Sequence, residues 1–154
     1  MNLSDTRAII TGGVSGLGFA IAQHIVAHRG KVALFDINSL KAAEAITLLG
    51  AANAVYLSTD VSDEMQVAEN TAKAAEFMGG LNAAINCAGI IGAGRVLGRE
   101  ACMPLAQFSN TIRVNLIGSF NIAKAAADVM QHNSSGEDGE RGVIIHTASV
   151  AAFD

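Results

Sequence analysis

The chain has 154 residues, of which 51% are hydrophobic and 16% charged, and its formal net charge is -4. A chain of this length is expected to form one domain, residues 1–154. Ten scattered Lys and Arg residues give no basic surface for nucleic acid, and no apolar run reaches the ~18 residues of a membrane span. Cys87 and Cys102 lack disulfide or metal-ligand spacing, and no secretion signal opens the chain, which predicts a cytoplasmic protein without a metal site.

Short β-type runs alternate with longer helical runs, which predicts a parallel sheet covered by crossover helices. The predicted strands are residues 7–11, 31–36, 54–58, 81–87 and 142–147. The predicted helices are residues 16–29 with Gly30 as the C-cap glycine, 39–49 with Asn38 as the N-cap, 62–78, and 107–131. Residues 92–105 are expected to be irregular with one helical turn, and residues 132–141 form a polar surface loop.

A glycine-rich turn, TGGVSGLG at residues 11–18, joins the first predicted strand to the first helix. At Gly12, Gly16 and Gly18 the missing side chains allow a tight turn, close approach of a diphosphate and tight packing of helix on strand. The Ser15 hydroxyl and the amides near Leu17 are expected to donate to the phosphates. The alternative is that the glycines serve only a sharp turn, and the strand-turn-helix context favours dinucleotide binding.

Asp36 ends the second predicted strand, where an acidic residue accepts hydrogen bonds from the adenosine ribose and repels a 2'-phosphate. Because Val14, Ile37 and Asn38 stand where a Lys or Arg would offset that charge, the sequence predicts NAD rather than NADP. The alternative is that Asp36 only begins a turn. The pattern as a whole predicts a Rossmann-like, doubly wound α/β fold with strand order 3-2-1-4-5.

Four further segments follow predicted strands or lie on the long helix: DV at 60–61, NCAG at 86–89, RVNL at 113–116 and TAS at 147–149. Together with the glycine-rich turn, and in this order, they resemble the short-chain dehydrogenase/reductase family over essentially the whole chain. The motifs at 11–18 and 86–89 and the stretch from 142 look particularly like those of type-2 3-hydroxyacyl-CoA dehydrogenases. The resemblance implies an NAD-dependent oxidoreductase of 3-hydroxyacyl-CoA or a related secondary alcohol, a homo-oligomer when complete, and a sheet here truncated before its last two strands.

The resemblance also implies roles for individual residues. Asp60 would accept from the adenine amino group, the Val61 backbone would meet the ring, and Asn86 would stabilise the sheet. The adenosine-ribose side of the cofactor would be lined by Cys87, Ala88 and Gly89. Asp60 alternatively only starts a helix.

Two residues are implied on the substrate side. Ser149 would hydrogen-bond the reacting oxygen, and Asn115 would kink its helix and hold a water in a proton relay. Alternatively, Asn115 is a buried amide satisfied by backbone, and Ser149 bonds locally. His146, where relatives usually carry asparagine, is interpreted as a strand residue and not as a base.

The family's catalytic Tyr-x-x-x-Lys pair is absent from these 154 residues, whose single tyrosine is Tyr56 and whose last lysine is Lys124. The chain alone is therefore expected to be nearly inactive, because losing a positioned acid-base group costs ~10²- to 10⁴-fold in rate. The alternatives are a non-catalytic dinucleotide-binding or interaction module, and another doubly wound domain that binds a flavin or a nucleotide sugar.

Overall fold

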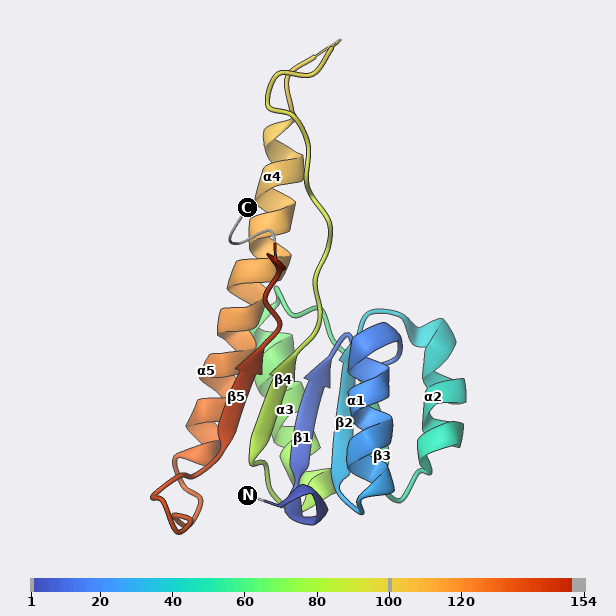
Figure 1. The fold of residues 1–154 in the computed structure, drawn as a ribbon, viewed down its shortest axis with the longest axis vertical. Coiled ribbons are helices and arrows are strands. Elements are labelled where there is room, and N and C mark those ends of the chain that lie inside the picture. The colour runs from blue at the N-terminus through green and yellow to red at the C-terminus, as the bar shows by residue number, and fades with distance from the viewer. Residues whose placement is uncertain (1, 100, 151–154) are drawn as a thin grey trace.

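The computed structural model describes residues 2–99 and 101–150, and in this part of the chain five parallel strands form one sheet (Figure 1). Their order is β3-β2-β1-β4-β5, so the predicted α/β fold and strand order are confirmed. The strands are β1 (Arg7–Thr11), β2 (Lys31–Asp36), β3 (Ala54–Ser58), β4 (Ala83–Asn86) and β5 (Val143–His146).

Helices cover both faces of this sheet. The helix α1 (Gly16–Ala27), the 3-10 turn η2 (Ser39–Lys41) and α2 (Ala42–Leu49) lie on one face, and α3 (Glu64–Met78) and α5 (Gly118–Met130) lie on the other (Figure 1). A further 3-10 turn, η1 (Leu3–Asp5), precedes β1. The chain thus winds outward from β1 in both directions, which places a crevice at the carboxyl ends of β1 and β4.

The core has two parts, one on each face of the sheet. Ile10 and Leu34 pack toward α1 and α2, and Ile9 and Phe35 pack toward α3 and α5, all fully buried. Central parallel strands are covered on both faces, which is why β1 and β2 read as continuous apolar runs and not as alternating ones.

The long helix before β5 has three segments. It begins with α4 (Leu105–Ile112), continues through a π-helical segment η3 (Arg113–Ile117), and ends with α5. In η3 the amide of Gly118 donates to the carbonyl of Arg113, five residues back. The predicted helix at 107–131 is therefore confirmed as an element, and the sequence pattern missed its π-helical segment. Such segments occur mostly as single turns inside α-helices and often at functional sites.

The end of α1 corrects the prediction that Gly30 is its C-cap glycine. The left-handed residue is Arg29, with φ 71°, and the amides of Arg29 and Gly30 donate to the carbonyls of Val26 and Ile25. This is a Schellman arrangement in which an arginine takes the position usually given to glycine. Gly30 is required for space, because a Cβ there would lie 2.5 Å from Ile25 Cγ2 and 2.8 Å from the Leu3 carbonyl oxygen.

Other boundaries differ by a few residues. The helix predicted from residue 62 begins at Glu64, because Asp63 is the N-cap and accepts from the Gln66 amide at 3.0 Å. The strands predicted at 81–87 and 142–147 are shorter in the structure. Residues 92–99 and 101–104 show an antiparallel bridge between Leu97 and Cys102 and not the expected helical turn, and α4 already begins at Leu105.

The sheet is less well covered near β5. An apolar groove of about 360 Å³ lies beside α1, β4 and β5, and Ile145 in its lining is 47% exposed. Within residues 2–99 and 101–150, β5 pairs with β4 and with no other strand. No helix in the same ranges is long and apolar enough to cross a membrane.

Candidate functional site

A cavity of about 530 Å³ opens at the carboxyl ends of β1, β2, β3 and β4. It lies at the point where the chain reverses its direction of winding, the usual ligand position in open α/β sheets. The lining includes eleven of the twelve residues predicted to bind a cofactor: Gly12, Ser15, Gly16, Leu17, Gly18, Asp36, Asp60, Val61, Cys87, Ala88 and Gly89. Residues far apart in sequence therefore meet in one place because their strands are parallel.

The glycine-rich turn forms one wall and starts α1. Gly16 has φ 51°, and no atom lies within 4 Å of the position of a Cβ there, so the backbone faces open space. At Gly18 a Cβ would lie 2.5 Å from the Gly12 carbonyl oxygen, which fixes the close approach of α1 to the end of β1. Ser15 is the N-cap residue, its side chain makes no capping hydrogen bond, and the first turn has no acidic residue. The helix thus presents unpaired amides and partial positive charge to the cavity.

The Asp36 carboxylate is fixed by backbone donors on both oxygens. Oδ2 accepts from the Val14 amide at 3.3 Å, and Oδ1 accepts from the Asn38 amide at 2.9 Å. The Asp36 carbonyl accepts from the Tyr56 hydroxyl at 2.9 Å. The carboxylate is half-buried and keeps acceptor capacity, because each oxygen has a second lone pair. Asn38 is the N-cap residue of the 3-10 turn η2, where its side chain accepts from the Leu40 amide at 3.2 Å. The helix predicted at 39–49 is divided into η2 and α2, and the N-cap residue of α2 is Lys41.

Asp60 lies on the next strand end and is held mainly by Ser62. The hydroxyl and the amide of Ser62 both donate to Asp60 Oδ1, at 2.7 and 2.9 Å. These bonds, with a smaller contribution from the positive charge of Arg113, lower the pKa of Asp60 against the opposing effect of burial. Oδ2 accepts no hydrogen bond from any residue that the structure describes and stays open as an acceptor.

Thr11 ties the ends of β1 and β4 together. Its Oγ1 accepts from the amides of Cys87 and Ala88 at 3.0 and 2.9 Å, and Thr11 is buried. Asn86 lies behind the cavity and outside its lining, where Nδ2 and His146 Nδ1 are 3.2 Å apart. His146 is the last residue of β5, which confirms its interpretation as a strand residue.

The two predicted substrate-side residues lie outside this lining. Asn115 is in the π-helical segment, and its side chain clamps the backbone of Ile90: Oδ1 accepts from the Ile90 amide at 2.9 Å, and Nδ2 donates to the Ile90 carbonyl at 3.0 Å. Asn115 therefore orders the loop after β4. Ser149 follows β5 and is exposed.

Several further lining residues were not predicted from the sequence to contact a cofactor. They are Phe35, Ile37, Thr59, Ile90, Asn110, Arg113 and Val114. Some of these residues are adjacent in sequence to predicted site residues. For them, a position next to the end of a predicted strand was the feature that could have indicated a place in the cavity lining. Asn110 and Arg113 come from the long helix. Arg113 opens the RVNL motif, but the role implied for that motif fell on Asn115, and the sequence did not show that Arg113 reaches the cavity.

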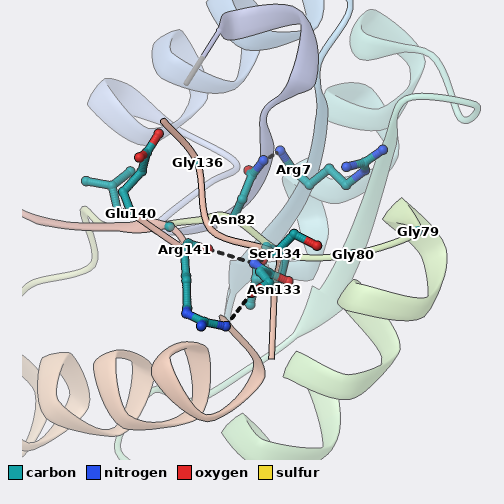
Figure 2. A pocket seen from close by; sticks show the side chains of 12 residues that line it. Arg7, Gly79, Gly80, Asn82, Asn133, Ser134, Gly136, Glu140 and Arg141 are labelled. Carbon is teal, nitrogen blue, oxygen red and sulfur yellow. Dashed lines mark hydrogen bonds between the residues drawn. The ribbon is translucent and has the colours of Figure 1, made fainter. Parts of the chain in front are cut away.

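A second cavity, of about 600 Å³, lies at the amino ends of the strands (Figure 2). The polar side chains Asn133 and Arg141 in its lining form hydrogen bonds that stabilise the loop before β5. Arg141 Nη1 donates to the carbonyls of Gln131 and Asn133, and Asn133 Nδ2 donates to the carbonyls of Leu81 and Arg141. Asn82 accepts from the Arg7 amide at 2.8 Å. Although this cavity is larger, these groups serve the loop, so the candidate site is the cavity at the carboxyl ends.

Comparison with known proteins gives consistent similarities. A family model described as short chain dehydrogenase matches residues 6–154. The chain is 40% identical over 150 residues to the 3-hydroxyacyl-CoA dehydrogenase type-2 of Rattus norvegicus, covering 96% of this chain and 57% of that protein. It is 35% identical over 150 residues to the 2,5-dichloro-2,5-cyclohexadiene-1,4-diol dehydrogenase of Sphingobium indicum, covering 97% of this chain and 56% of that protein.

Among solved structures, the 3-hydroxyacyl-CoA dehydrogenase type-2 from Mycobacterium avium matches with a TM-score of 0.88 and 29% identity. The match covers 96% of this chain and 58% of the mycobacterial chain. The chain therefore spans less than two thirds of the length of each of these relatives.

Proposed function

Because the chain belongs to the short-chain dehydrogenase family, we propose that it provides the NAD-binding cleft of an oxidoreductase that interconverts secondary alcohols and ketones. The observation that carries this proposal is the gathering of the glycine-rich turn, Asp36 and Asp60 around one cavity. NAD would supply the hydride acceptor, and the residues below would hold it.

The diphosphate would rest on the first turn of α1. The open space at Gly16 supports this, because a phosphate can approach the backbone there. The Ser15 hydroxyl has no capping role and can donate to a phosphate oxygen, and no acidic side chain in the first turn opposes the negative charge. The amides near Leu17 would supply the remaining donors.

The adenosine half would lie against the two carboxylates. Asp36 would accept from the ribose hydroxyls, since its fixed oxygens retain lone pairs, and its charge would disfavour the 2'-phosphate of NADP. Asp60 would accept from the adenine amino group through the open Oδ2, beside the Val61 backbone. Cys87, Ala88 and Gly89 would line the ribose side, and Asn86 would act through the sheet.

On the substrate side, Ser149 would hydrogen-bond the reacting oxygen. Asn115 would act as a positioning residue through Ile90, and its remaining N–H and lone pair would hold a water. Tyr56 is excluded as the proton-transfer group because its hydroxyl donates to the Asp36 carbonyl away from the cavity lining. Residues 1–154 would therefore bind cofactor and show little turnover by themselves.

The proposed substrate is a 3-hydroxyacyl-CoA or a related hydroxylated compound. The proposal is supported by similarity to dehydrogenases whose names state such substrates. We propose the cytoplasm as the location, where Cys87 and Cys102 would stay reduced, as both are free in the structure.

We also propose a homo-oligomer. An exposed apolar stripe runs along the continuous helix from α4 to α5, with the side chains three or four residues apart on one face: Leu105, Phe108, Ile112, Leu116 and Phe120. Burial against another copy of the protein would remove this surface from water.

Calorimetric titration of the chain with NAD and with NADP tests the proposal directly. We expect NAD to bind and NADP to bind at least about tenfold more weakly, in line with the loss of a charge-assisted contact and added repulsion. Equal affinities would favour a different doubly wound binder. If the chain binds NAD but the reading frame beyond Asp154 encodes no Tyr-x-x-x-Lys pair, a non-catalytic module is favoured. If the pair is encoded there and the complete protein reduces NAD with 3-hydroxyacyl-CoA esters, the enzyme is favoured.

A further inference from the structure

Arg113 is a positively charged residue in the cavity lining, and the proposed contacts of the glycine-rich turn, Asp36 and Asp60 give it no role. It is the first residue of the π-helical segment, and Asn110, one helical turn before it, lines the same cavity. The two side chains form a pair, in which Arg113 Nη2 donates to Asn110 Oδ1 at 3.1 Å. The pair orients the guanidinium on the helix face that borders the cavity.

The helix is held at this border by the loop after β3. Asn121 Nδ2, buried in α5, donates to the Val61 carbonyl at 3.0 Å, and Val61 follows Asp60. Arg113 is close enough to Asp60 for its charge to lower the pKa of that carboxyl. Arg113, Asn110 and Asp60 all line the cavity. The long helix also packs closely on the loop that carries Asp60, since a Cβ at Gly118 would lie 2.5 Å from Val61 Cγ2, so the three side chains border the same end.

This end offers hydrogen-bond donors and an acceptor together. A guanidinium has five N–H donors, and Arg113 uses one of them on Asn110. Asp60 keeps Oδ2 as an acceptor. A phosphate would meet the Asp60 carboxylate here and be repelled. A purine base fits better, since adenine carries an amino donor flanked by ring-nitrogen acceptors, and a guanidinium also stacks on bases.

We propose that Arg113 is a cofactor-binding residue that contacts the adenine base of the dinucleotide, beside Asp60. This inference rests on the proposed function and extends it to a residue from the long helix. Within the RVNL motif the role implied from the sequence fell on Asn115 and not on Arg113. The contact of Arg113 depends on how η3 and α5 pack on the loop after β3.

The test measures dissociation constants of adenosine, ADP and NAD, by NMR titration for adenosine and by calorimetry for the others. Arg113→Met removes the charge and all donors while keeping a long side chain, and Arg113→Lys restores a cationic donor. We expect Arg113→Met to weaken all three ligands by a similar factor of about threefold to tenfold, the range of one lost hydrogen bond. Arg113→Lys should recover a large part of that loss.

Lys124→Met is the matched control, because it removes a cation from the same continuous helix, at a site where Lys124 pairs with Glu64 outside the cavity lining. It should leave all three constants unchanged. Weakening of ADP and NAD without weakening of adenosine would assign Arg113 to a phosphate and overturn the inference, and so would unchanged binding in Arg113→Met. If the unsubstituted chain bound none of the three ligands, the proposed function itself would fail.

Discussion

The carboxylate of Asp36 accepts a hydrogen bond from the Val14 amide, 3.3 Å from Oδ2, and so joins the end of β2 to the glycine-rich turn after β1. Its other oxygen accepts from the Asn38 amide at 2.9 Å. The orientation of the carboxylate is therefore set by the protein backbone. A preorganised acceptor costs little entropy on binding, which makes Asp36 the first residue to test.

Asp36→Ala is expected to weaken NAD binding by about tenfold or more, because hydrogen bonds to a charged group contribute about 1.5–3 kcal/mol. The preference for NAD over NADP should narrow, since the repulsion of a 2'-phosphate is removed as well. Calorimetric titration with both cofactors measures the two effects. Asp128→Ala, which removes an exposed carboxylate on α5, is the control and should change neither affinity. Unchanged NAD affinity in Asp36→Ala would refute the proposed ribose contact.

Gly16→Ala and Gly18→Ala are both expected to lower the stability of the fold, for different physical reasons, and Gly16→Ala should also weaken NAD binding. At Gly18 the added Cβ meets the Gly12 carbonyl oxygen at 2.5 Å, so the unfolding free energy should fall by about 1–3 kcal/mol, as for overpacking. At Gly16 there is space, and the cost in stability should be about 1–2 kcal/mol from the positive φ alone. Gly16→Ala should in addition obstruct the diphosphate. Denaturation curves and NAD titrations of both variants separate the effects; full NAD affinity in a folded Gly16→Ala protein would contradict the phosphate assignment.

Thr11→Val tests the link between β1 and β4. The substitution keeps the shape of the side chain and removes the acceptor of two amides, those of Cys87 and Ala88. An unsatisfied buried donor costs about 1–3 kcal/mol, so the urea midpoint should fall clearly. Thr47→Val on α2 is the matched control, because the Thr47 hydroxyl donates to the Ala43 carbonyl on an exposed face. Equal midpoints for the two variants would show that the Thr11 hydroxyl contributes nothing to stability.

Arg29→Gly is expected to stabilise the fold. Arg29 has φ 71°, and a left-handed conformation costs a residue with a side chain about 1–2 kcal/mol relative to glycine. The neighbouring change Gly30→Ala should destabilise it, because the added Cβ meets Ile25 Cγ2 and the Leu3 carbonyl. Thermal denaturation should shift upward for the first and downward for the second. A lower melting temperature for Arg29→Gly would mean that the Arg29 side chain makes a compensating contact.

Ser62→Ala is expected to change how stability depends on pH. The pKa of Asp60 is below its ordinary value of 3.8 in the folded chain, chiefly because of the Ser62 hydroxyl. A lowered folded pKa contributes stability that is present above the unfolded pKa and is lost as pH falls through the folded pKa. The variant should therefore be less stable than the parent near neutral pH, and the two should converge in acid below the folded pKa. Urea unfolding at a series of pH values measures this. In an Asp60→Asn background the pH-dependent part of the difference should vanish, and its persistence would assign it to another group.

The sheet is the part of the fold that was predicted most accurately from the sequence. The strands β1, β2 and β3 were predicted with their observed bounds, because buried parallel strands are continuous apolar runs between turn residues. The meeting of the glycine-rich turn with Asp36 and Asp60 was also predictable, since parallel strands bring their carboxyl ends to one edge.

Tertiary contacts explain what the sequence did not reveal. Gly30 looks like a helix cap in sequence, and only the approach of Ile25 and Leu3 shows that it is needed for space. The same holds for Thr11, whose partners Cys87 and Ala88 directly follow β4. It also holds for Arg113, whose helix is anchored on the loop after β3 at Val61. Each of these roles depends on a residue distant in sequence, which local patterns do not encode.

The position of β5 at an edge of the sheet determines where another strand can be added to this fold. The proposed cofactor crevice lies at the carboxyl ends of β1, β2, β3 and β4, whereas β5 forms the edge of the sheet opposite β3. Among the residues that the structure describes, β5 pairs only with β4, so the outer backbone border of β5 has no strand partner there. An extended segment that hydrogen-bonds along this border would lengthen the sheet by one strand without touching the walls of the crevice. The edge at which the sheet can be extended and the proposed cofactor site thus lie in separate regions, so one can vary while the other stays intact.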